Sequence, residues 1–217
     1  MGNEGLIHWL MGLPIFEAEW VLWLLFLLSF VSICVMIERV WFYQAHRVNV
    51  VQLRKELDGL LARGDFEAAA RALERHDTLE TNVVLFGLRQ YGKGPEAVEE
   101  LLAGAEALEI QRYQQRLGFL ATLGNNAPFI GLFGTVLGII KAFADLGGDM
   151  DLASGELMDG IAEALVLTGV GLLVAIPAVV AYNACSARVK KHTANLRFLS
   201  HALLAVLKSE PPREEAT

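Results

Sequence analysis

Three long apolar stretches restrict the folds that this 217-residue chain can adopt. They cover residues 20–37, 118–143 and 161–182, close to or above the run of about 20 apolar residues that crosses a hydrocarbon core. Because lipid offers no partner for exposed backbone groups, such stretches cross a membrane as helices. Hydrophobic residues make up 54% of the sequence and charged residues only 20%, which also favours a membrane protein. We therefore predict an all-α membrane protein with three transmembrane helices.

The basic residues predict how these helices are oriented. Orientation follows lysine and arginine in short flanking segments rather than the net charge of −7. Residues 145–158 include acidic side chains and no basic one. Basic clusters follow the first and third apolar stretches: Arg39, Arg47, Arg54 and Lys55, then Arg188, Lys190, Lys191 and Arg197. We predict that the N-terminus lies outside, and that residues 44–110 and the C-terminus lie inside, in the cytoplasm.

This topology divides the chain into seven predicted segments. They are a periplasmic or interfacial N-terminal segment (1–19), a first transmembrane helix (20–43), a cytoplasmic helical domain (44–110), a second transmembrane helix (111–144), a periplasmic loop (145–158), a third transmembrane helix (159–183), and a cytoplasmic C-terminal helix with its tail (184–217).

The ends of the chain and its cysteines add smaller expectations. Residues 1–19 contain no lysine or arginine, and no small-residue cleavage site follows the first apolar stretch, so we expect a retained anchor rather than a signal peptide. Residues 5–13 predict a short amphipathic piece at the membrane interface. The tail 209–217 has two prolines and no apolar period, which predicts disorder. Cys34 and Cys185 are interpreted as packing thiols rather than as a disulfide.

The segment 44–110 has helical character, because leucine and alanine recur every three or four residues among strong helix formers. Gly64 indicates the end of one helix and Asp65 the N-cap of the next. Gly94 and Pro95 indicate a second break, with Pro95 at the start of a new helix. No helix breaker follows before the second apolar stretch. We therefore expect one long helix that extends from the cytoplasmic domain into the membrane.

Small side chains form a stripe along the second and third apolar stretches. At 100° per residue they share one face of each helix: Gly124, Pro128, Gly131, Thr135, Gly138 and Ala142 in the second stretch, and Ala164, Thr168, Gly171, Ala175 and Ala178 in the third. Such stripes let helices pack closely in lipid. Because each stripe carries one hydroxyl, two of them can also form a narrow, weakly polar wall beside a moving polar partner or a file of water. Both interpretations stay open, as does the simpler one that each threonine bonds its own i−4 carbonyl.

A few other residues interrupt the apolar stretches. Glu163 is the acidic residue within them, and an intramembrane carboxylate is a functional candidate by default. We expect it to be either a proton-path residue or one half of a structural pair at an interface. Pro128 and Pro177 predict helix kinks that either shape a pore or serve packing. Asn125 and Asn126 precede the first proline, and their effect is open.

Several classes of function have no support in the sequence. We find no P-loop, no paired metal-ligating histidines and no nucleophile elbow, so we expect no enzyme activity, no cofactor and no metal. The five histidines lie outside the apolar stretches. Basic residues of the segment 44–110 are interleaved with at least as many acidic ones, which argues against nucleic-acid binding.

Two motifs resemble the MotA/TolQ/ExbB proton-channel family, and most closely its TolQ and ExbB branch. They are APFIGLFGTVLGIIKAF at 127–143 and GIAEALVLTGVGLLVAIPAVVAYN at 160–183, within a similar three-span plan with the N-terminus outside. Thr135 and Thr168 match the pore-facing threonines of that family, Glu163 its glutamate, and Pro177 its proline. The GNNAPF stretch departs from the pattern, because relatives usually have smaller or hydroxyl residues before the alanine-proline pair.

The resemblance implies a pore-forming subunit of a motor complex that is driven by the proton-motive force in the bacterial inner membrane. It implies a homopentamer whose second and third spans line a pore, with pore-facing small residues at Gly131, Gly138, Ala164, Gly171 and Ala175. It also implies two copies of an ExbD/TolR-like single-span partner whose transmembrane aspartate carries protons, and a TonB-like or other envelope protein beyond it. Proton flow would then perform mechanical work in TonB-dependent uptake, the Tol-Pal system or gliding, among which the sequence does not choose.

Two rival interpretations remain at this point. A passive membrane scaffold or a transport permease subunit would use the glycine stripes only for helix packing, and would need no single-span partner. An intramembrane enzyme is disfavoured because the spans offer one carboxylate and no histidine.

Overall fold

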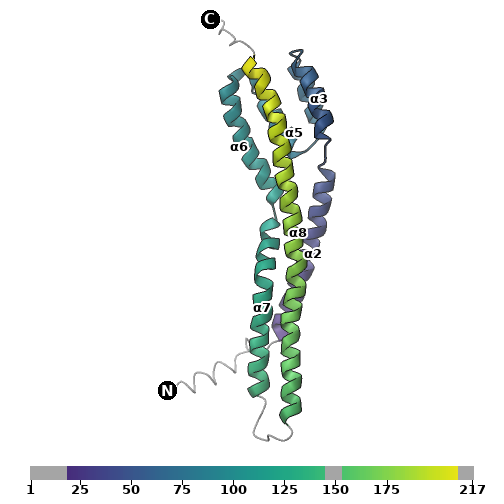
Figure 1. The fold of residues 1–217 in the computed structure, drawn as a ribbon, viewed down its shortest axis with the longest axis vertical. Helices are drawn as coiled ribbons and strands as arrows, with labels where there is room; N and C mark the ends of the chain where they lie inside the picture. The colour runs from purple at the N-terminus through teal and green to yellow at the C-terminus, as the bar shows by residue number, and fades with distance from the viewer. Residues whose placement is uncertain (1–18, 145–152, 210–217) are drawn as a thin grey trace, which may run out of the picture. The chain divides into compact units, whose positions relative to one another are not determined.

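The computed structural model describes residues 19–144 and 153–209, and each regular element in these ranges is helical (Figure 1). Within this part, three helices are long and apolar enough to cross a membrane: α2 (Glu19–Ala45), α7 (Leu117–Ala144) and α8 (Ala153–Ser209). The prediction of an all-helical chain with three candidate spans is therefore confirmed. The sidedness of these spans and the exact segment limits stay predictions. The expected interfacial piece 5–13, the residues 145–152 of the connection and the tail from 210 onward lie outside the described residues.

The chain divides into two compact units. Unit 1 comprises Met1–Ile37 and Arg116–Asn183, and unit 2 comprises Glu38–Gln115 and Ala184–Thr217. Unit 1 holds the apolar parts of α2, α7 and α8, whereas unit 2 holds the charged segment that the sequence assigns to the cytoplasm. Each unit is described separately below.

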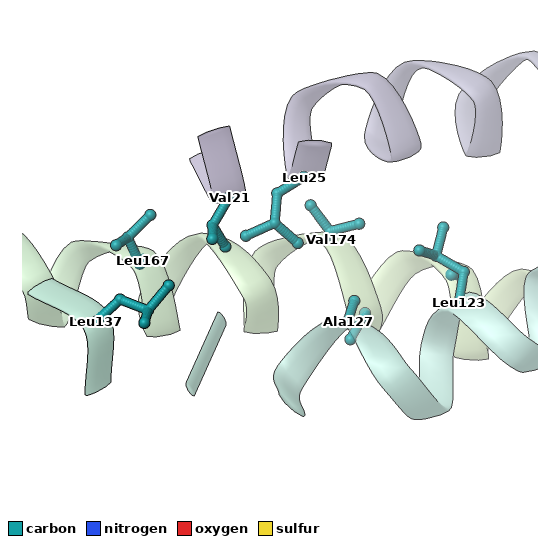
Figure 2. Close-up of a cluster of buried hydrophobic side chains, with 9 residues drawn as sticks. Val21, Leu25, Leu123, Ala127, Leu137, Leu167 and Val174 are labelled. Carbon is teal, nitrogen blue, oxygen red and sulfur yellow. The ribbon is translucent and has the colours of Figure 1, made fainter. Parts of the chain in front are cut away.

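In unit 1 the three helices share one apolar core (Figure 2). Its buried members come from all three helices: Val21, Leu25, Leu123, Ala127, Leu137, Leu167, Val174, Ala175 and Ala178. Many large apolar side chains of the same helices point away from this core, as Trp23, Phe129 and Leu173 do with 73%, 68% and 72% of their surface exposed. A water-soluble domain would bury such residues, so this pattern is typical of helices that face lipid or other subunits.

Unit 2 is built from short helices beside the C-terminal part of α8. They are α3 (Val50–Leu61), α4 (Phe66–Glu74), α5 (Leu79–Leu88), the 3₁₀ helix η2 (Tyr91–Lys93) and α6 (Pro95–Gln114). The predicted punctuation is confirmed: Gly64 has a positive φ of 68° after α3, and the Asp65 side chain accepts from the Ala68 backbone N–H as the N-cap of α4. Pro95 begins α6 as predicted. A capping box of Thr78 and Thr81 starts α5.

The expected single helix from Pro95 into the second span is wrong. The structure ends α6 at Gln114 and begins α7 at Leu117, with Arg116 at a positive φ of 63°. A left-handed arginine costs roughly 1–2 kcal/mol, so packing on both sides must impose it. Tyr113 is fully buried in unit 2 and Leu117 is 3% exposed in unit 1. Residues 114–117 contain no glycine or proline, so tertiary contacts rather than local propensity account for the break.

Two tyrosines tie the elements of unit 2 together at this end of α6. The Tyr43 hydroxyl donates to the backbone carbonyl of Tyr113 at 2.7 Å, and the Tyr113 hydroxyl accepts from the Leu79 backbone N–H at 3.0 Å. Both rings are buried. These bonds link α2, α6 and the first turn of α5, and they use polar groups that burial would otherwise leave unsatisfied.

Candidate functional site

The small residues of α7 and α8 meet along the seam between these two helices. A Cβ added to Gly131 would lie 2.7 Å from the Leu167 carbonyl oxygen and 3.1 Å from the Gly171 Cα. A Cβ added to Gly171 would lie 2.7 Å from the Ala127 carbonyl oxygen. These contacts involve backbone atoms, which cannot rotate away. Glycine is therefore required here so that the two helices can approach closely.

The two predicted threonines meet in this seam. The hydroxyls of Thr135 and Thr168 are within hydrogen-bonding distance of each other, and the Thr135 hydroxyl is also 3.2 Å from the carbonyl oxygens of Gly131 and Ala164. A hydroxyl has one proton to donate, so only one of these acceptors receives the Thr135 proton at a time. The Gly131 contact is the i−4 bond that the simplest interpretation expected, but the contacts to Thr168 and Ala164 cross to the other helix.

The remaining small residues extend the seam in both directions. Gly138 faces Ala164, whose Cβ would be 2.7 Å from a Cβ at position 138. Ala175 and Gly171 are buried, and Thr135 exposes only 7% of its surface while Thr168 is partly exposed. Of the small residues that the sequence singled out, the structure thus brings Gly131, Gly138, Ala164 and Gly171 together in the seam. Whether the hydroxyl pair borders a pore in an oligomer stays a prediction, because it concerns contacts beyond a single chain.

Glu163 lies apart from the threonine pair, in a cavity of about 260 Å³ within unit 1. Helices α2, α7 and α8 contribute to its lining: Glu19, Leu22, Gly138, Lys141, Ala142, Glu156, Leu157, Gly160, Glu163, Ala164, Val166 and Leu167. The Glu163 side chain is exposed. The cavity reaches Gly138 and Ala164, which also belong to the seam, so a polar region adjoins this end of the small-residue stripe. The role of Glu163 in a proton path stays a prediction.

The structure shows where the remaining predicted residues lie, but it does not test the roles predicted for them. Pro128 lies inside α7 and Pro177 inside α8, and both helices continue through them. Asn126 donates from its side-chain amide to the Thr122 carbonyl at 2.7 Å, whereas the carbonyl that Pro128 leaves without its helical donor is that of Gly124, four residues before it. Both asparagines are exposed. The kinks that the prolines predict stay predictions.

The threonine pair can form hydrogen bonds with a passing polar group, but it cannot itself carry a charge. Threonine hydroxyls donate and accept hydrogen bonds, yet they do not ionise in the physiological range, so a proton needs a titratable carrier beside them. Within the described part of the chain, no group of three or more histidine, cysteine or acidic side chains could hold a metal ion.

Sequence reasoning missed one buried polar pair in unit 2. Glu80 is fully buried in α5, and its Oε1 accepts hydrogen bonds from His192 Nδ1 at 2.8 Å and from Asn195 Nδ2 at 3.2 Å, both on α8. These residues are more than 110 positions apart, and no local pattern distinguishes Glu80 from the exposed acids around it. Only the fold brings the three side chains together.

Comparison with known proteins gives a consistent family. The profile described as the MotA/TolQ/ExbB proton channel family matches residues 71–197. The Tol-Pal system protein TolQ of Pseudomonas aeruginosa is 45% identical over 46% of this chain and 45% of its own length, and TolQ of Haemophilus influenzae is 40% identical over 53% and 56%. The biopolymer transport protein ExbB of Neisseria meningitidis is 33% identical over 88% of this chain and 91% of its own length. The chain thus spans about half the length of these TolQ relatives and nearly all of this ExbB.

Proposed function

Because the chain belongs to the MotA/TolQ/ExbB proton channel family, whose members are transport and motor proteins rather than enzymes, we propose that it is the pore-forming subunit of a motor driven by the proton-motive force. The motor lies in the bacterial inner membrane with unit 2 in the cytoplasm. It comprises five copies of this chain around two copies of an ExbD/TolR-like single-span partner. Proton flow past the partner performs work on the cell envelope.

The observation that carries this proposal is the hydroxyl pair of Thr135 and Thr168 in a seam otherwise lined by glycine and alanine. Two hydroxyls that share hydrogen bonds across two helices present one polar position in an apolar wall. A partner carboxyl that passes this position can exchange a hydrogen bond with it, whereas bulky aliphatic side chains would block the passage. Thr168 is the more exposed of the two, so we assign it the contact with the partner and Thr135 the role of holding its hydroxyl.

The proton-motive force supplies enough energy for this scheme. At a membrane potential of about 100 mV, each proton that crosses releases roughly 2.3 kcal/mol before any pH difference is added. This is about the strength of one or two hydrogen bonds to a charged group. Each transfer can therefore break the contact between the partner carboxyl and one threonine pair and allow the next contact to form.

The experiment is proton uptake into liposomes that contain this chain with its single-span partner. Thr168→Val removes the hydroxyl at nearly constant shape, and Thr168→Leu adds bulk to the same position. We expect both variants to assemble with the partner and to lose most of the proton flux, and Thr135→Val to show a similar loss. The matched control is Ser32→Ala, because Ser32 carries a buried hydroxyl that donates to the Ser29 carbonyl of its own helix α2 and lies outside the seam.

Full proton-dependent activity in the variants of both threonines would refute the pore assignment. The close packing of Gly131 against Gly171 favours one rival, a passive scaffold that uses the stripe only for helix contact. That rival predicts assembly without a single-span partner and no response to a proton uncoupler. The relatives are named for the Tol-Pal system and for biopolymer transport. Co-purification of the partner, followed by its identification, assigns the chain to one of these systems.

A further inference from the structure

Unit 2 contains a cavity that the proposed channel does not use. Its volume is about 320 Å³, near the small end of the range of roughly 300–1,000 Å³ that ligand pockets occupy. The lining comes from α5, from α8 and from the end of α2 with the residues that follow it: Tyr43, Arg47, Val48, Glu80, Arg188, Lys191, His192 and Asn195. A space of this size suits a headgroup rather than a whole lipid.

Three of the lining side chains are cations, Arg47, Arg188 and Lys191, and none of them forms an ion pair within residues 19–144 and 153–209. This is unusual for unit 2. Seven of its ten described arginines are paired with a carboxylate of the same chain: Arg39, Arg54, Arg71, Arg75, Arg89, Arg112 and Arg197. Two of the three arginines without such a pair line this cavity. Its positive charge therefore attracts an anion from outside the chain.

The one carboxylate in the lining does not neutralise these cations. Glu80 is fully buried, and its Oε1 is already bonded to His192 and Asn195. Burial raises the pKa of Glu80, but its hydrogen bonds, among them those from His192 and Asn195, together outweigh this effect, so the pKa lies below its usual value. Its Oε2 is buried and has no hydrogen-bond partner in the described structure. A hydroxyl or water that accompanies a hydrated headgroup would supply the missing donor.

The position of the cavity in the sequence favours a lipid over a soluble anion. Arg188 follows the predicted end of the third span at residue 183, and five helical residues rise about 7.5 Å, close to the depth of the headgroup layer. Val40 and Trp41 of α2 lie shortly before Arg47 in the sequence and expose 45% and 74% of their surface. Exposed apolar and indole side chains that closely precede basic residues in the sequence are typical of the membrane interface.

We propose that this cavity binds the phosphate headgroup of an anionic phospholipid of the cytoplasmic leaflet. Arg47, Arg188 and Lys191 contact the phosphate oxygens, while His192 and Asn195 are held against Glu80 and shape the inner wall. The proposal rests on the cytoplasmic placement of unit 2 in the proposed function. The bound lipid would fix the point at which α2 and α8 leave the membrane.

The test measures lipid retention by native mass spectrometry of the full chain, co-purified with its partner in mild detergent. The probes are dioleoyl phosphatidylglycerol, dioleoyl phosphatidylcholine and inorganic phosphate, each titrated separately. We expect preferential retention of phosphatidylglycerol. The double variant Arg188→Gln, Lys191→Gln should weaken this binding about thirtyfold, since two juxtamembrane cations typically contribute about that factor. Arg47→Gln, at an exposed position, should weaken it by a smaller factor and serves as a second variant if the double variant fails to fold.

Lys190→Gln is the matched control, because Lys190 is an exposed neighbour on α8 that does not line the cavity. It should bind phosphatidylglycerol like the wild type. An equal loss in this control, or equal retention of phosphatidylcholine, would show non-specific attraction and overturn the proposal. If the protein retained inorganic phosphate as strongly as phosphatidylglycerol, the lipid proposal would be wrong and the site would belong to a soluble phosphate compound.

The lipid-retention experiment and the proton-uptake experiment can fail independently of each other. Lipid retention in detergent does not depend on proton flow, so a chain that bound phosphatidylglycerol but conducted no protons would refute only the channel assignment. A chain that drove proton uptake with its partner but showed no lipid preference would refute only the headgroup site.

Discussion

Gly171→Ala tests the close approach of α7 and α8 most directly. An alanine Cβ at this position would lie 2.7 Å from the Ala127 carbonyl oxygen and 3.0 Å from the Gly131 Cα. Both neighbours are backbone atoms, so relief requires the two helices to separate. Overpacking of this kind typically costs about 1–3 kcal/mol. The same substitution gains about 1 kcal/mol of helix propensity, which hides part of the loss if the variant is compared only with the wild type.

Gly169→Ala corrects for that gain. Gly169 lies two residues earlier on α8, and a Cβ there has no neighbour within 4 Å in the described chain. Both variants replace an interior helical glycine, so the propensity gain cancels and the difference in their stability reports the seam contact. For a chain of this length, 1 kcal/mol corresponds to roughly 2–4 °C in Tm. We therefore expect Gly171→Ala to melt roughly 2–12 °C below Gly169→Ala.

The assay is thermal unfolding of the purified protein in detergent, followed by far-ultraviolet circular dichroism and by loss of the monodisperse peak in size exclusion. Gly131→Ala enters the same contact from the opposite helix and should cost a similar amount. The double variant should cost less than the sum, because the first substitution already separates the helices. If Gly171→Ala melted together with Gly169→Ala, the helices would not be in backbone contact at this point, and the role we assign to the stripe would be refuted.

Three further predictions concern unit 2. Thr78→Ala removes the side-chain half of the α5 capping box and should lower the free energy of unfolding by about 1 kcal/mol, measured as faster amide exchange in that helix. Hydrogen bonds from Arg112 to Asp77, at 3.0 and 3.1 Å, hold the pKa of this carboxyl below its usual value, so its contribution is present above the unfolded pKa of about 3.9 and is lost as the pH falls. The stability gap between wild type and Asp77→Asn should therefore be full at pH 7 and should narrow below about pH 4 in acid titrations of unfolding. Gly87→Ala places a Cβ 2.5 Å from a terminal methyl of Leu102, and since that side chain can rotate, chemical denaturation should reveal a loss of only about 1 kcal/mol.

Helical periodicity predicted which faces of α7 and α8 carry the threonines, but not what these faces contact. The positions of Thr135 and Thr168 on small-residue faces follow from helical period alone, and the structure places both in the α7–α8 seam. Helical period does not say which helix each face meets, or that Thr135 reaches the Ala164 carbonyl of the other helix. Glu163 was singled out for its charge, but its place in a cavity beside Lys141 depends on three helices at once.

Local signals on the chain determined where helices form and where most of them end. Apolar runs of spanning length, the N-cap at Asp65 and the proline that starts α6 act within one or two turns, so they can be read without knowledge of the fold. The break at Arg116 and the hydrogen bond that Glu80 accepts from His192 were decided only by tertiary structure. Both depend on contacts with residues distant in sequence and leave no local sequence pattern, and at Arg116 these contacts also outweigh the local preference for a continuous helix.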